Sequence, residues 1–449
     1  MPYGREPARE VIGRVASSFA ELPDGLGPSA GDGPLGWPGY GDQLARAAAS
    51  TGERESAVCG VAEIGGVTAA VVAFEFGFLG GSLGTRTGAR IEQAFTHARE
   101  LGLPVVSLVA TGGSRMQEGT LALMQLPRIA RQLTLNREAG LPHIAVLRDP
   151  TTGGGWATLG AGADVVLGLR GAQVGFAGSR VRPPGYSVTQ QFAAGLVDQL
   201  LAPEELRERL ERWLRLLTTT STGGPAPVPP ALGQATLPKS GWDAVVRART
   251  LGRPRAKEYL ASYFDWHEPV SGDRGGGVDP GVLCGFGHRD GQTIAYAAQC
   301  GTATRPAGFR TAARLVRLAD RLGIPVLTLV DTPGAANDEV AEKAGVGAAI
   351  ADMFTAVAAA RVPVTTLVIG EGGSGGALAF AAPDRMWVTP DCYFAVISPE
   401  LANAILKRDP ARARQTAEEL RLRPQDLVEL GVARGIAQPD QSADQATAR

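Results

Sequence analysis

The chain has 449 residues, more than a typical single domain, so two domains are expected. Apolar residues make up 44% and charged residues 20%, and the formal net charge of -1 gives no general attraction to nucleic acid or to a membrane surface. No uncharged apolar run is long enough to span a bilayer, and charged residues follow Met1 where a secretion signal has its apolar core. The chain is therefore expected to be cytoplasmic, with neither nucleic acid nor membrane as a partner.

The four cysteines lie far apart in the sequence, at positions 59, 284, 300 and 392. None forms a Cys-x-x-Cys pair of the kind that binds zinc or carries redox chemistry. The sequence therefore predicts no metal, and the widely spaced thiols fit a reducing compartment.

Strands and helices alternate along the first half of the chain. A mixed stretch with a Gly- and Pro-rich loop at 23–41 comes first, followed by strands within 61–76 and a glycine-rich turn at 77–84. The pattern then predicts a helix at 90–101, a strand at 103–109, a helix at 117–138 and a strand at 142–147. A helix starting within 156–162 and a helical stretch at 187–217 complete this half. Residues 218–238 are rich in Thr, Gly and Pro and indicate a domain boundary. The expected organisation is a first domain at 1–220, a linker at 221–240 and a second domain at 241–449.

The second half repeats the first. Leu-Gly-Leu-Pro at 101–104 recurs as Leu-Gly-Ile-Pro at 322–325, an offset of 221 residues. Pro142 and Pro363 are separated by the same offset, which places Gly154 on Gly375. An offset that holds through two strands and their glycine turns predicts two copies of one fold.

In both copies a buried strand runs into a glycine-rich turn and a helix follows, a pattern typical of an α/β fold. The first N–H groups of a helix have no partner within it and can hold an anionic oxygen. Glycines let a carbonyl group approach these N–H groups without meeting a side chain. The pattern therefore predicts two oxyanion pockets, one in each half.

Other reaction types find little support in the sequence. The four histidines, at positions 97, 143, 267 and 288, belong to no Ser-His-Asp or metal-binding pattern, and no Walker motif occurs. A nucleophilic Ser374 stays as a minor alternative, because its Gly-Gly-Ser-Gly-Gly context lacks the spacing of a nucleophile elbow. The favoured chemistry is polarisation of a carbonyl by backbone amides.

Several longer motifs resemble one enzyme family. Residues 78–84 (FLGGSLG), 112–119 (GGSRMQEG), 149–154 (DPTTGG) and 175–178 (GFAG) resemble the β subunit of the carboxyltransferase of acetyl-CoA carboxylase. Residues 331–335 (DTPGA), 370–377 (GEGGSGGA) and 397–400 (ISPE) resemble its α subunit. The resemblance covers roughly residues 55 to 435, with the β-like part first, as in fused single-chain carboxyltransferases.

The resemblance implies a fold of two tandem ClpP/crotonase-like domains, each a spiral of ββα units. It implies transfer of CO2 from carboxybiotin, carried on a separate protein, to acetyl-CoA or a related acyl-CoA, giving malonyl-CoA or its relative. A biotin enolate and a thioester enolate would be held in the two oxyanion holes. The implied partners are a biotin carboxyl carrier protein, a biotin carboxylase subunit and further copies of the chain, as a homodimer or higher oligomer with active sites between chains.

The resemblance also assigns residues to the site. Gly153 and Gly154 would hold the thioester carbonyl, and Gly375, Gly376 and Ala377 the ureido oxygen of biotin. Further residues expected to line the substrate cleft are Gly112, Gly113, Gly155, Trp156 and Gly334, with Arg86 and Arg90 facing the phosphates of CoA. Arg115 and Glu118 are expected to form a structural ion pair.

The sequence departs from the family pattern at several places. The Cys-x-x-Cys zinc ribbon of the β subunit is absent, so no zinc is expected. Residues 300–308 form a shorter segment than the α subunit has, Leu401 replaces a glycine after Ser-Pro-Glu, and Trp156 is bulky enough to narrow the thioester pocket. Two alternatives therefore stay open: a decarboxylase of malonyl-type thioesters on the same scaffold, and a non-catalytic paralogue within a carboxylase complex.

Overall fold

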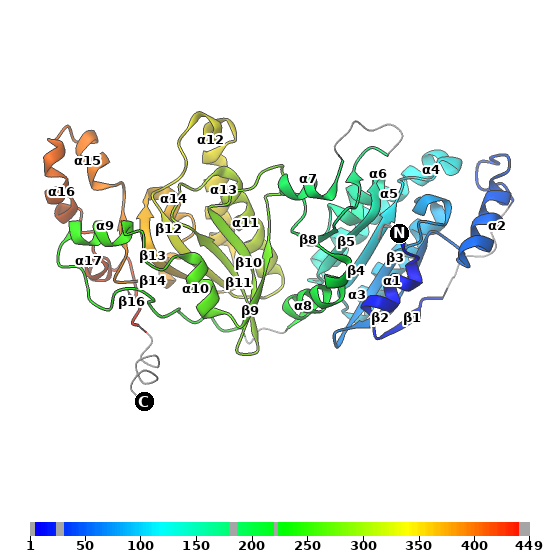
Figure 1. The fold of residues 1–449 in the computed structure, drawn as a ribbon, viewed down its shortest axis with the longest axis horizontal. Helices are drawn as coiled ribbons and strands as arrows, with labels where there is room; N and C mark the ends of the chain where they lie inside the picture. Colours follow the sequence, from blue (N-terminus) through cyan, green and yellow to red (C-terminus); the bar gives the residue numbers. More distant parts are fainter. Residues whose placement is uncertain (1–4, 24–30, 179–185, 220–222, 440–449) are drawn as a thin grey trace. The chain divides into compact units, whose positions relative to one another are not determined.

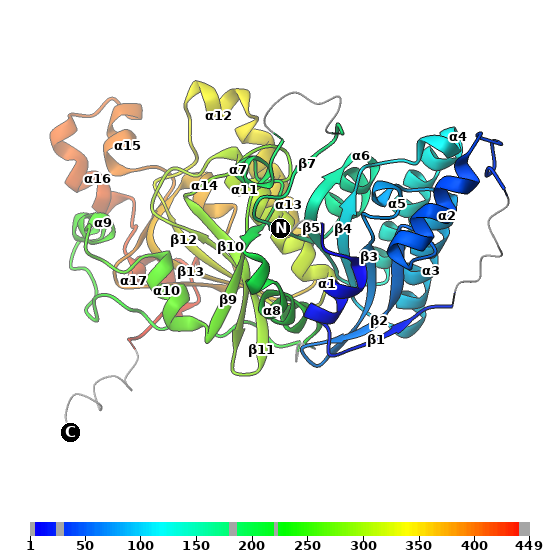
Figure 2. The ribbon, with the colours of Figure 1, turned by 45° about the vertical axis from the view of Figure 1, so that its right-hand side comes forward.

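The computed structural model describes residues 5–23, 31–178, 186–219 and 223–439 (Figures 1 and 2). The chain divides into two compact units. Unit 1 contains the described residues up to Thr218 together with Arg274–Gly276, and unit 2 contains the rest. Each unit is built around one eight-stranded sheet with helices on it.

The sheet of unit 1 has the order β1-β2-β3-β4-β5-β6-β8, and β7 pairs with β5. The first three strands run antiparallel, and the others pair in parallel. Their bounds are β1 (Ser18–Glu21), β2 (Ala57–Ile64), β3 (Val67–Phe74), β4 (Val105–Thr111), β5 (His143–Thr152), β6 (Val165–Leu169), β7 (Val174–Gly175) and β8 (Gln199–Leu201). The parallel strands β4 and β5 are almost fully buried, as expected for strands covered on both faces.

The helices of unit 1 cover both faces of this sheet. They are α1 (Ala8–Val15), α2 (Tyr40–Thr51), α3 (Thr85–Leu101), α4 (Gly119–Leu123), α5 (Gln125–Glu138), α6 (Gly153–Gly155), α7 (Val188–Ala193) and α8 (Leu206–Thr218). Ile91 and Phe95 of α3 and Ile129 of α5 join Val72 and Phe74 of β3 in the main core cluster. Because the apolar residues of α3 and α5 recur on one face, each helix buries that face on the sheet.

Unit 2 repeats this arrangement with the order β16-β14-β13-β12-β11-β10-β9 and with β15 paired to β13. Its strands are β9 (Trp266–Val270), β10 (Val282–Arg289), β11 (Gln292–Gln299), β12 (Val326–Thr332), β13 (Val364–Gly373), β14 (Met386–Val388), β15 (Tyr393–Ala395) and β16 (Gly435–Ile436). Its helices are α9 (Gly241–Arg249), α10 (Ala256–Tyr263), α11 (Pro306–Arg321), α12 (Glu339–Lys343), α13 (Val346–Ala359), α14 (Ser374–Leu378), α15 (Pro399–Ile405), α16 (Ala413–Glu419) and α17 (Pro424–Glu429).

The internal repeat predicted from the sequence is confirmed at the central strands of the two units. Strands β4 and β5 lie 221 positions before β12 and β13, at both their starts and their ends. Both pairs also share one irregularity, a register shift between Val109 and Thr111 and between Val330 and Thr332. The two units are therefore copies of one fold down to the backbone at the ends of their central strands.

Two predicted stretches differ in the structure. Residues 187–217 were predicted to be helical throughout, and this is wrong, because Gly195 ends α7 with a φ of +70° and β8 follows. Of the predicted linker 221–240, residues 221 and 222 lie outside the described residues. Beyond them the chain belongs to unit 2, and Ala226 and Ala231 pack in its core.

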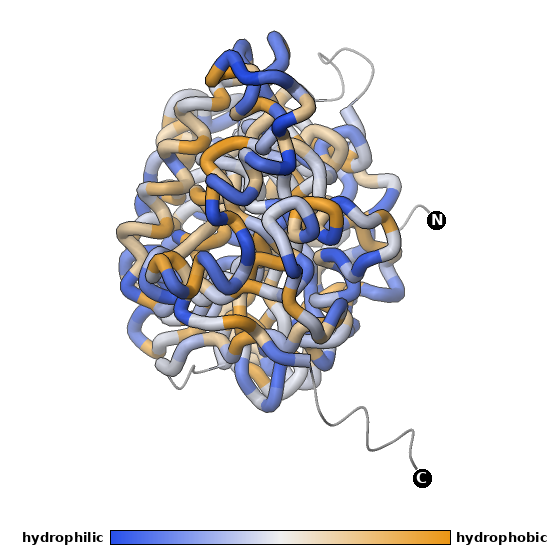
Figure 3. Tube along the Cα trace, turned by 90° about the vertical axis from the view of Figure 1, so that its left-hand side faces the viewer, coloured by the Kyte–Doolittle hydropathy of each residue, from blue (hydrophilic) through white to orange (hydrophobic). Residues whose placement is uncertain are grey.

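Hydrophilic segments occupy many of the outer turns of the trace (Figure 3). No helix among the described residues is long and apolar enough to cross a bilayer.

Candidate active site

The glycine turn of unit 1 lies at the end of β5. The chain leaves the strand at Gly153 with a φ of +61°, a left-handed conformation that favours glycine, and enters α6 at once. The N–H of Gly153 donates to the carbonyl oxygen of Phe176 at 2.9 Å. The N–H groups of Gly154 and Gly155 belong to the first helical turn and so have no partner within the helix. The expected donor Gly153 is thus already engaged, and Gly154 and Gly155 form the donor pair that could hold an anionic oxygen in unit 1.

A second glycine backbone packs against this turn. A Cβ added to Gly153 would lie 2.9 Å from the Cα of Gly113, so the two backbones are in contact. The N–H of Gly113 already donates to Thr111 Oγ1 at 3.0 Å, and the N–H of Gly112 to the carbonyl oxygen of Gly80 at 2.8 Å. Gly112 and Gly113 are therefore a wall beside the donors and not donors themselves.

Unit 2 has the same turn at the end of β13. Ser374, at the position of Gly153, adopts a φ of +57°, and α14 begins there. A Cβ on Gly375 would meet no atom within 4 Å, whereas one on Gly376 would lie 2.4 Å from the backbone nitrogen of Ala335. The N–H of Gly334 donates to Thr332 Oγ1 at 3.1 Å, as Gly113 does to Thr111. Gly375, Gly376 and Ala377 are thus brought together in the first turn of α14, where Gly375 borders open space and Gly376 packs on the wall formed by Gly334 and Ala335.

A buried side chain that the sequence interpretation missed supports the turn of unit 2. Gln299 is fully buried at the end of β11, and its Nε2 donates to the carbonyl oxygen of Gly376 at 3.0 Å and to Thr304 Oγ1 at 3.1 Å. This bond fixes the peptide of Gly376 with its carbonyl directed toward the core. A glutamine that ends an apolar strand is the sequence signal that could have identified it.

Two residues expected in the substrate cleft have other surroundings. The indole of Trp156 packs in the core of unit 1 with Ala145 and Leu147 and is only 8% exposed. Arg90 is buried and paired to Glu21, with Nη2 2.6 Å from Oε1. Neither side chain is free to meet a ligand in this arrangement.

Arg86 has a different setting from Arg90. It lines a cavity of about 450 Å³ together with Arg54, Phe78 and an apolar strip of α2. Glu55 also lines this cavity, but its carboxylate pairs with Arg115, and the two guanidinium groups beside the apolar wall fit a ligand that carries phosphate. Arg86 therefore lies where a nucleotide end could bind.

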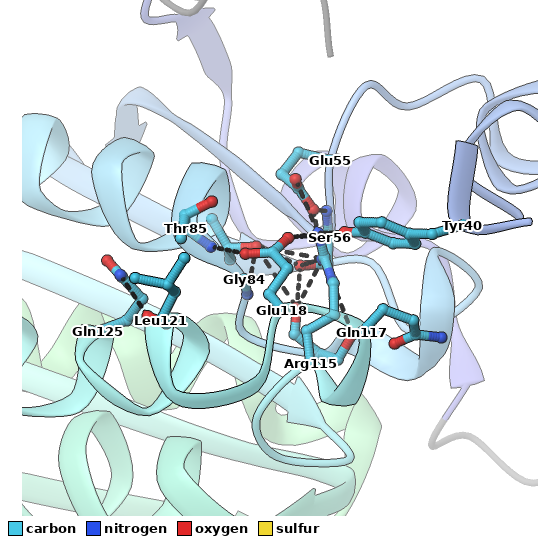
Figure 4. Close-up of polar contacts among 12 residues, drawn as sticks. Tyr40, Glu55, Ser56, Gly84, Thr85, Arg115, Gln117, Glu118, Leu121 and Gln125 are labelled. Atoms are coloured by element: carbon cyan, nitrogen blue, oxygen red, sulfur yellow. Dashed lines mark hydrogen bonds and ion pairs between the residues drawn. The ribbon is translucent and has the colours of Figure 1, made fainter. Parts of the chain in front are cut away.

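The expected ion pair between Arg115 and Glu118 is confirmed, with Nη1 3.4 Å from Oε1. A shorter pair joins Arg115 Nη2 to Glu55 Oε1 at 2.5 Å, and Tyr40 hydrogen-bonds within the same cluster (Figure 4). All four side chains are buried.

Each histidine has a partner away from the glycine turns. His143 Nε2 lies 2.8 Å from Ser107 Oγ, His267 Nδ1 2.9 Å from Tyr296 Oη and His288 Nδ1 3.0 Å from Asp265, while His97 faces Glu100. Burial lowers the pKa of His143 to about 4. No histidine in the described part of the chain hydrogen-bonds Ser374, so a triad finds no support there.

The described residues contain no group of three or more His, Cys, Asp or Glu side chains that could hold a metal ion. Backbone donors at two equivalent turns are the chemical feature that both units share. Such donors stabilise the oxyanion of a carbonyl whose neighbouring carbon is deprotonated or carboxylated.

Two family models match the chain. The one described as "Acetyl co-enzyme A carboxylase carboxyltransferase-like" matches residues 236–448, and "Carboxyl transferase domain" matches residues 37–183. The matches fall on unit 2 and unit 1 respectively, in the order expected from the motifs.

Curated relatives resemble the chain over most of its length. The acetyl-coenzyme A carboxylase carboxyl transferase subunits beta/alpha of Saccharopolyspora erythraea are 37% identical over 88% of this chain and 74% of that protein. Those of Salinispora arenicola are 39% identical over 88% of this chain and 75% of that protein. A probable biotin-dependent acyl-coenzyme A carboxylase beta3 subunit of Mycobacterium bovis is 33% identical over 88% and 82% of the two chains.

Among solved structures, transcarboxylase 12S with hydrolysed methylmalonyl-coenzyme A bound has a TM-score of 0.80 at 20% identity, covering 99% of this chain and 89% of that one. A single-chain, multi-domain long-chain acyl-CoA carboxylase has a TM-score of 0.76 at 19% identity, covering 99% of this chain and 47% of that one. These likenesses confirm the expected fold of two tandem crotonase-like units. Taken with the relatives, they show that the chain belongs to the carboxyltransferase family of biotin-dependent acyl-CoA carboxylases, with its β-type and α-type parts in one polypeptide.

Proposed function

We propose that this chain transfers a carboxyl group from carboxybiotin, borne on a biotin carboxyl carrier protein, to acetyl-CoA or a related acyl-CoA. A biotin carboxylase subunit would recharge the carrier. The observation that carries the proposal is the duplicated turn: Gly154 and Gly155 in unit 1 and Gly375, Gly376 and Ala377 in unit 2 present first-turn N–H groups at matching positions. Carboxyl transfer between two carbonyl compounds needs two such oxyanion sites.

Unit 1 is the proposed site of the thioester. The N–H groups of Gly154 and Gly155 would hold its carbonyl oxygen and so stabilise the negative charge that develops when the neighbouring carbon loses a proton. The wall at Gly112 and Gly113 would bring the thioester close, because no side chain projects there. The cavity beside Arg86 and Arg54 would take the phosphate-bearing end of the CoA.

Unit 2 is the proposed site of the biotin ureido group. The space beside Gly375 is open, with no atom within 4 Å of an added Cβ, so a ureido oxygen could approach the N–H groups of α14 there. When bound, carboxybiotin supplies both the CO2 and the base that removes the substrate proton. The chain's own residues then bind, orient and stabilise charge, which agrees with the histidine partners in the described part of the chain, none of which belongs to either glycine turn.

The cofactor requirement tests the proposed function. Purified protein incubated with malonyl-CoA should form acetyl-CoA only when free biotin or the biotinylated carrier protein is added. The reason is that the acceptor of the carboxyl group is biotin and no side chain replaces it. Product acyl-CoA is followed by chromatography and carboxylated carrier by mass spectrometry.

The same assay separates the competing functions. CO2 release at a comparable rate without biotin would identify a decarboxylase of malonyl-type thioesters. A folded protein that turns over neither malonyl-CoA nor methylmalonyl-CoA, with or without carrier, would identify a non-catalytic paralogue. Comparing the two acyl-CoA substrates also measures the acyl preference.

A further inference from the structure

We infer that Tyr40 is a positioning residue for the thioester wall, acting through Glu118 and Arg115 on the backbone of Gly113. This inference deepens the proposed function and rests on it for the identity of the ligand. Figure 4 shows the side chains of Tyr40, Glu118 and Arg115 and the polar contacts among them.

The Tyr40 hydroxyl hydrogen-bonds both Glu118 and Arg115 within a buried polar cluster. It donates to Glu118 Oε1 at 2.6 Å and accepts from Arg115 Nη1 at 3.2 Å. Arg115 in turn pairs with Glu55 through Nη2 at 2.5 Å and Nη1 at 3.1 Å. One guanidinium therefore faces two buried carboxylates, and its contact with Glu118 is the longer one, at 3.4 Å.

Because Arg115 lies closer to Glu55 than to Glu118, the carboxylate of Glu118 depends on neutral hydrogen-bond donors. Glu118 Oε2 accepts the N–H of Thr85 at 2.6 Å, and Oε1 accepts the Tyr40 hydroxyl. Burial acts against the charged form, but these hydrogen bonds and the charge of Arg115 lower the pKa of Glu118 below its usual value. Loss of the Tyr40 hydroxyl would leave a buried carboxylate with too few donors, which is unfavourable.

The cluster is connected to the site by two backbone hydrogen bonds and one backbone contact. The N–H of Arg115 donates to the carbonyl oxygen of Leu83 at 2.8 Å, and the N–H of Leu83 donates to the carbonyl oxygen of Gly113 at 2.8 Å. Gly113 in turn touches Gly153, whose missing Cβ would lie 2.9 Å from the Gly113 Cα. A shift of Arg115 therefore moves Gly113, and a shift of Gly113 moves the turn that presents the N–H of Gly154.

Unit 2 provides an internal comparison. At the offset of 221 residues, Thr304 takes the place of Leu83, donating its N–H to Gly334 at 3.0 Å and accepting from Ala336 at 2.9 Å. This pair of backbone hydrogen bonds, the backbone clamp, is thus common to both units. Position 336, however, is alanine where unit 1 has Arg115. Glu339, in the position of Glu118, is exposed and pairs with Lys343.

The fold can therefore make this clamp without a buried arginine. Unit 1 alone adds the arginine, its two carboxylates and Tyr40, at the desolvation cost that buried charges carry. We attribute the addition to the need for a rigid wall where the reacting thioester lies, because small displacements of a positioned group lower reaction rates strongly.

Tyr40→Phe in the full-length protein tests the inference, because it removes the hydroxyl and keeps the ring. We expect the amides of Leu83, Gly112 and Arg115 to exchange hydrogen for deuterium about tenfold faster than in wild type. In carboxyl transfer from carboxylated carrier protein to acetyl-CoA, we expect kcat to fall about tenfold. The KM for the carrier should stay unchanged, since unit 2 holds the biotin.

Tyr263→Phe is the matched control. Tyr263 is equally buried, in unit 2, and its hydroxyl donates to the carbonyl oxygen of Pro227 at 2.8 Å. This variant also loses a hydrogen bond of a buried tyrosine, here to a neutral carbonyl, and should show wild-type exchange at 83 and 112–115 and wild-type kcat. Equal losses in the two variants would mean that Tyr40 contributes only general stability.

The exchange measurement is independent of activity and so separates two failures. If the wild-type protein does not catalyse carboxyl transfer, the proposed function is wrong. The effect of Tyr40 on the backbone of Gly113 can still be tested by hydrogen exchange. A folded Tyr40→Phe protein with wild-type exchange at 112–115 would refute the positioning role. If Tyr40→Phe does not fold, Glu118→Gln, which keeps the volume and one acceptor oxygen, should give the same faster exchange, and wild-type exchange in that variant would equally refute the inference.

Discussion

Gly375→Val should lower carboxyl transfer by about 10²–10³ with little change in thermal stability. An added Cβ at this position meets no atom within 4 Å, and the backbone φ is not in the left-handed region, so the folded chain accepts the side chain. The isopropyl group would then occupy the space in which a ureido oxygen must approach the N–H groups of α14. Initial rates of acetyl-CoA carboxylation and the melting temperature together measure the effect.

Gly347→Val is a suitable control for this variant. Gly347 is likewise the second residue of a helix, α13, and a Cβ there also meets nothing within 4 Å, but α13 follows α12 and the left-handed Gly345 and does not stand at the end of a sheet strand. It should therefore carry the same helix-propensity cost without the loss of rate. Wild-type turnover in a folded Gly375→Val protein would show that α14 is not an oxyanion site.

The structure also explains why other glycines are less suitable for this test. A Cβ on Gly376 would collide with the backbone of Ala335, so loss of activity there could reflect loss of the fold. A Cβ on Gly154 would lie 2.3 Å from Leu126 Cδ2, a flexible side chain that can move. A side chain at Gly154 would therefore move Leu126 of α5 aside, so the folding of a Gly154→Val protein has to be checked before its activity is compared.

The parts of the fold that the sequence predicted well are local. The offset of 221 residues located β4, β5, β12 and β13, because apolar strands and the glycines that follow them leave a readable pattern. The left-handed φ of Gly153 accounts for one of those glycines, and the close contact of Gly113 with it accounts for another. Glycine turns were therefore informative because backbone geometry requires that residue.

Long-range contacts of polar side chains could not be predicted in the same way. Tyr40 meets Glu118 across 78 positions, and Arg90 meets Glu21 across 69. Nothing in the local pattern distinguishes an arginine that binds phosphate from one that pairs with a distant carboxylate. Trp156 was misplaced for a related reason, since periodicity does not show on which face of a π-helical turn an indole lies.

We expect the working site to combine unit 1 of one chain with unit 2 of another. Each unit presents apolar surface next to its turn: Leu121, Leu123 and Met124 are exposed around α4, and Phe354 and Leu378 line a cavity of about 410 Å³ beside α14. Apolar patches of this kind mark surfaces that another chain covers. Proton and carboxyl transfer also need the two carbonyl groups in near-contact geometry, so each thioester turn must face a biotin turn.

Mixing two inactive variants would test this arrangement. Gly375→Val leaves unit 1 intact and Gly154→Val leaves unit 2 intact. In a mixed two-fold dimer, the intact unit 1 of the first variant meets the intact unit 2 of the second, so one of the two sites works. Random assortment makes half of the dimers mixed, and each has one working site of two, so co-refolded protein should recover about a quarter of wild-type activity. Each variant refolded alone should stay inactive, and differently tagged chains show that mixed dimers have formed. If mixed dimers form and the mixture stays inactive, both turns of a site come from the same chain, and the apolar surfaces beside them serve assembly alone.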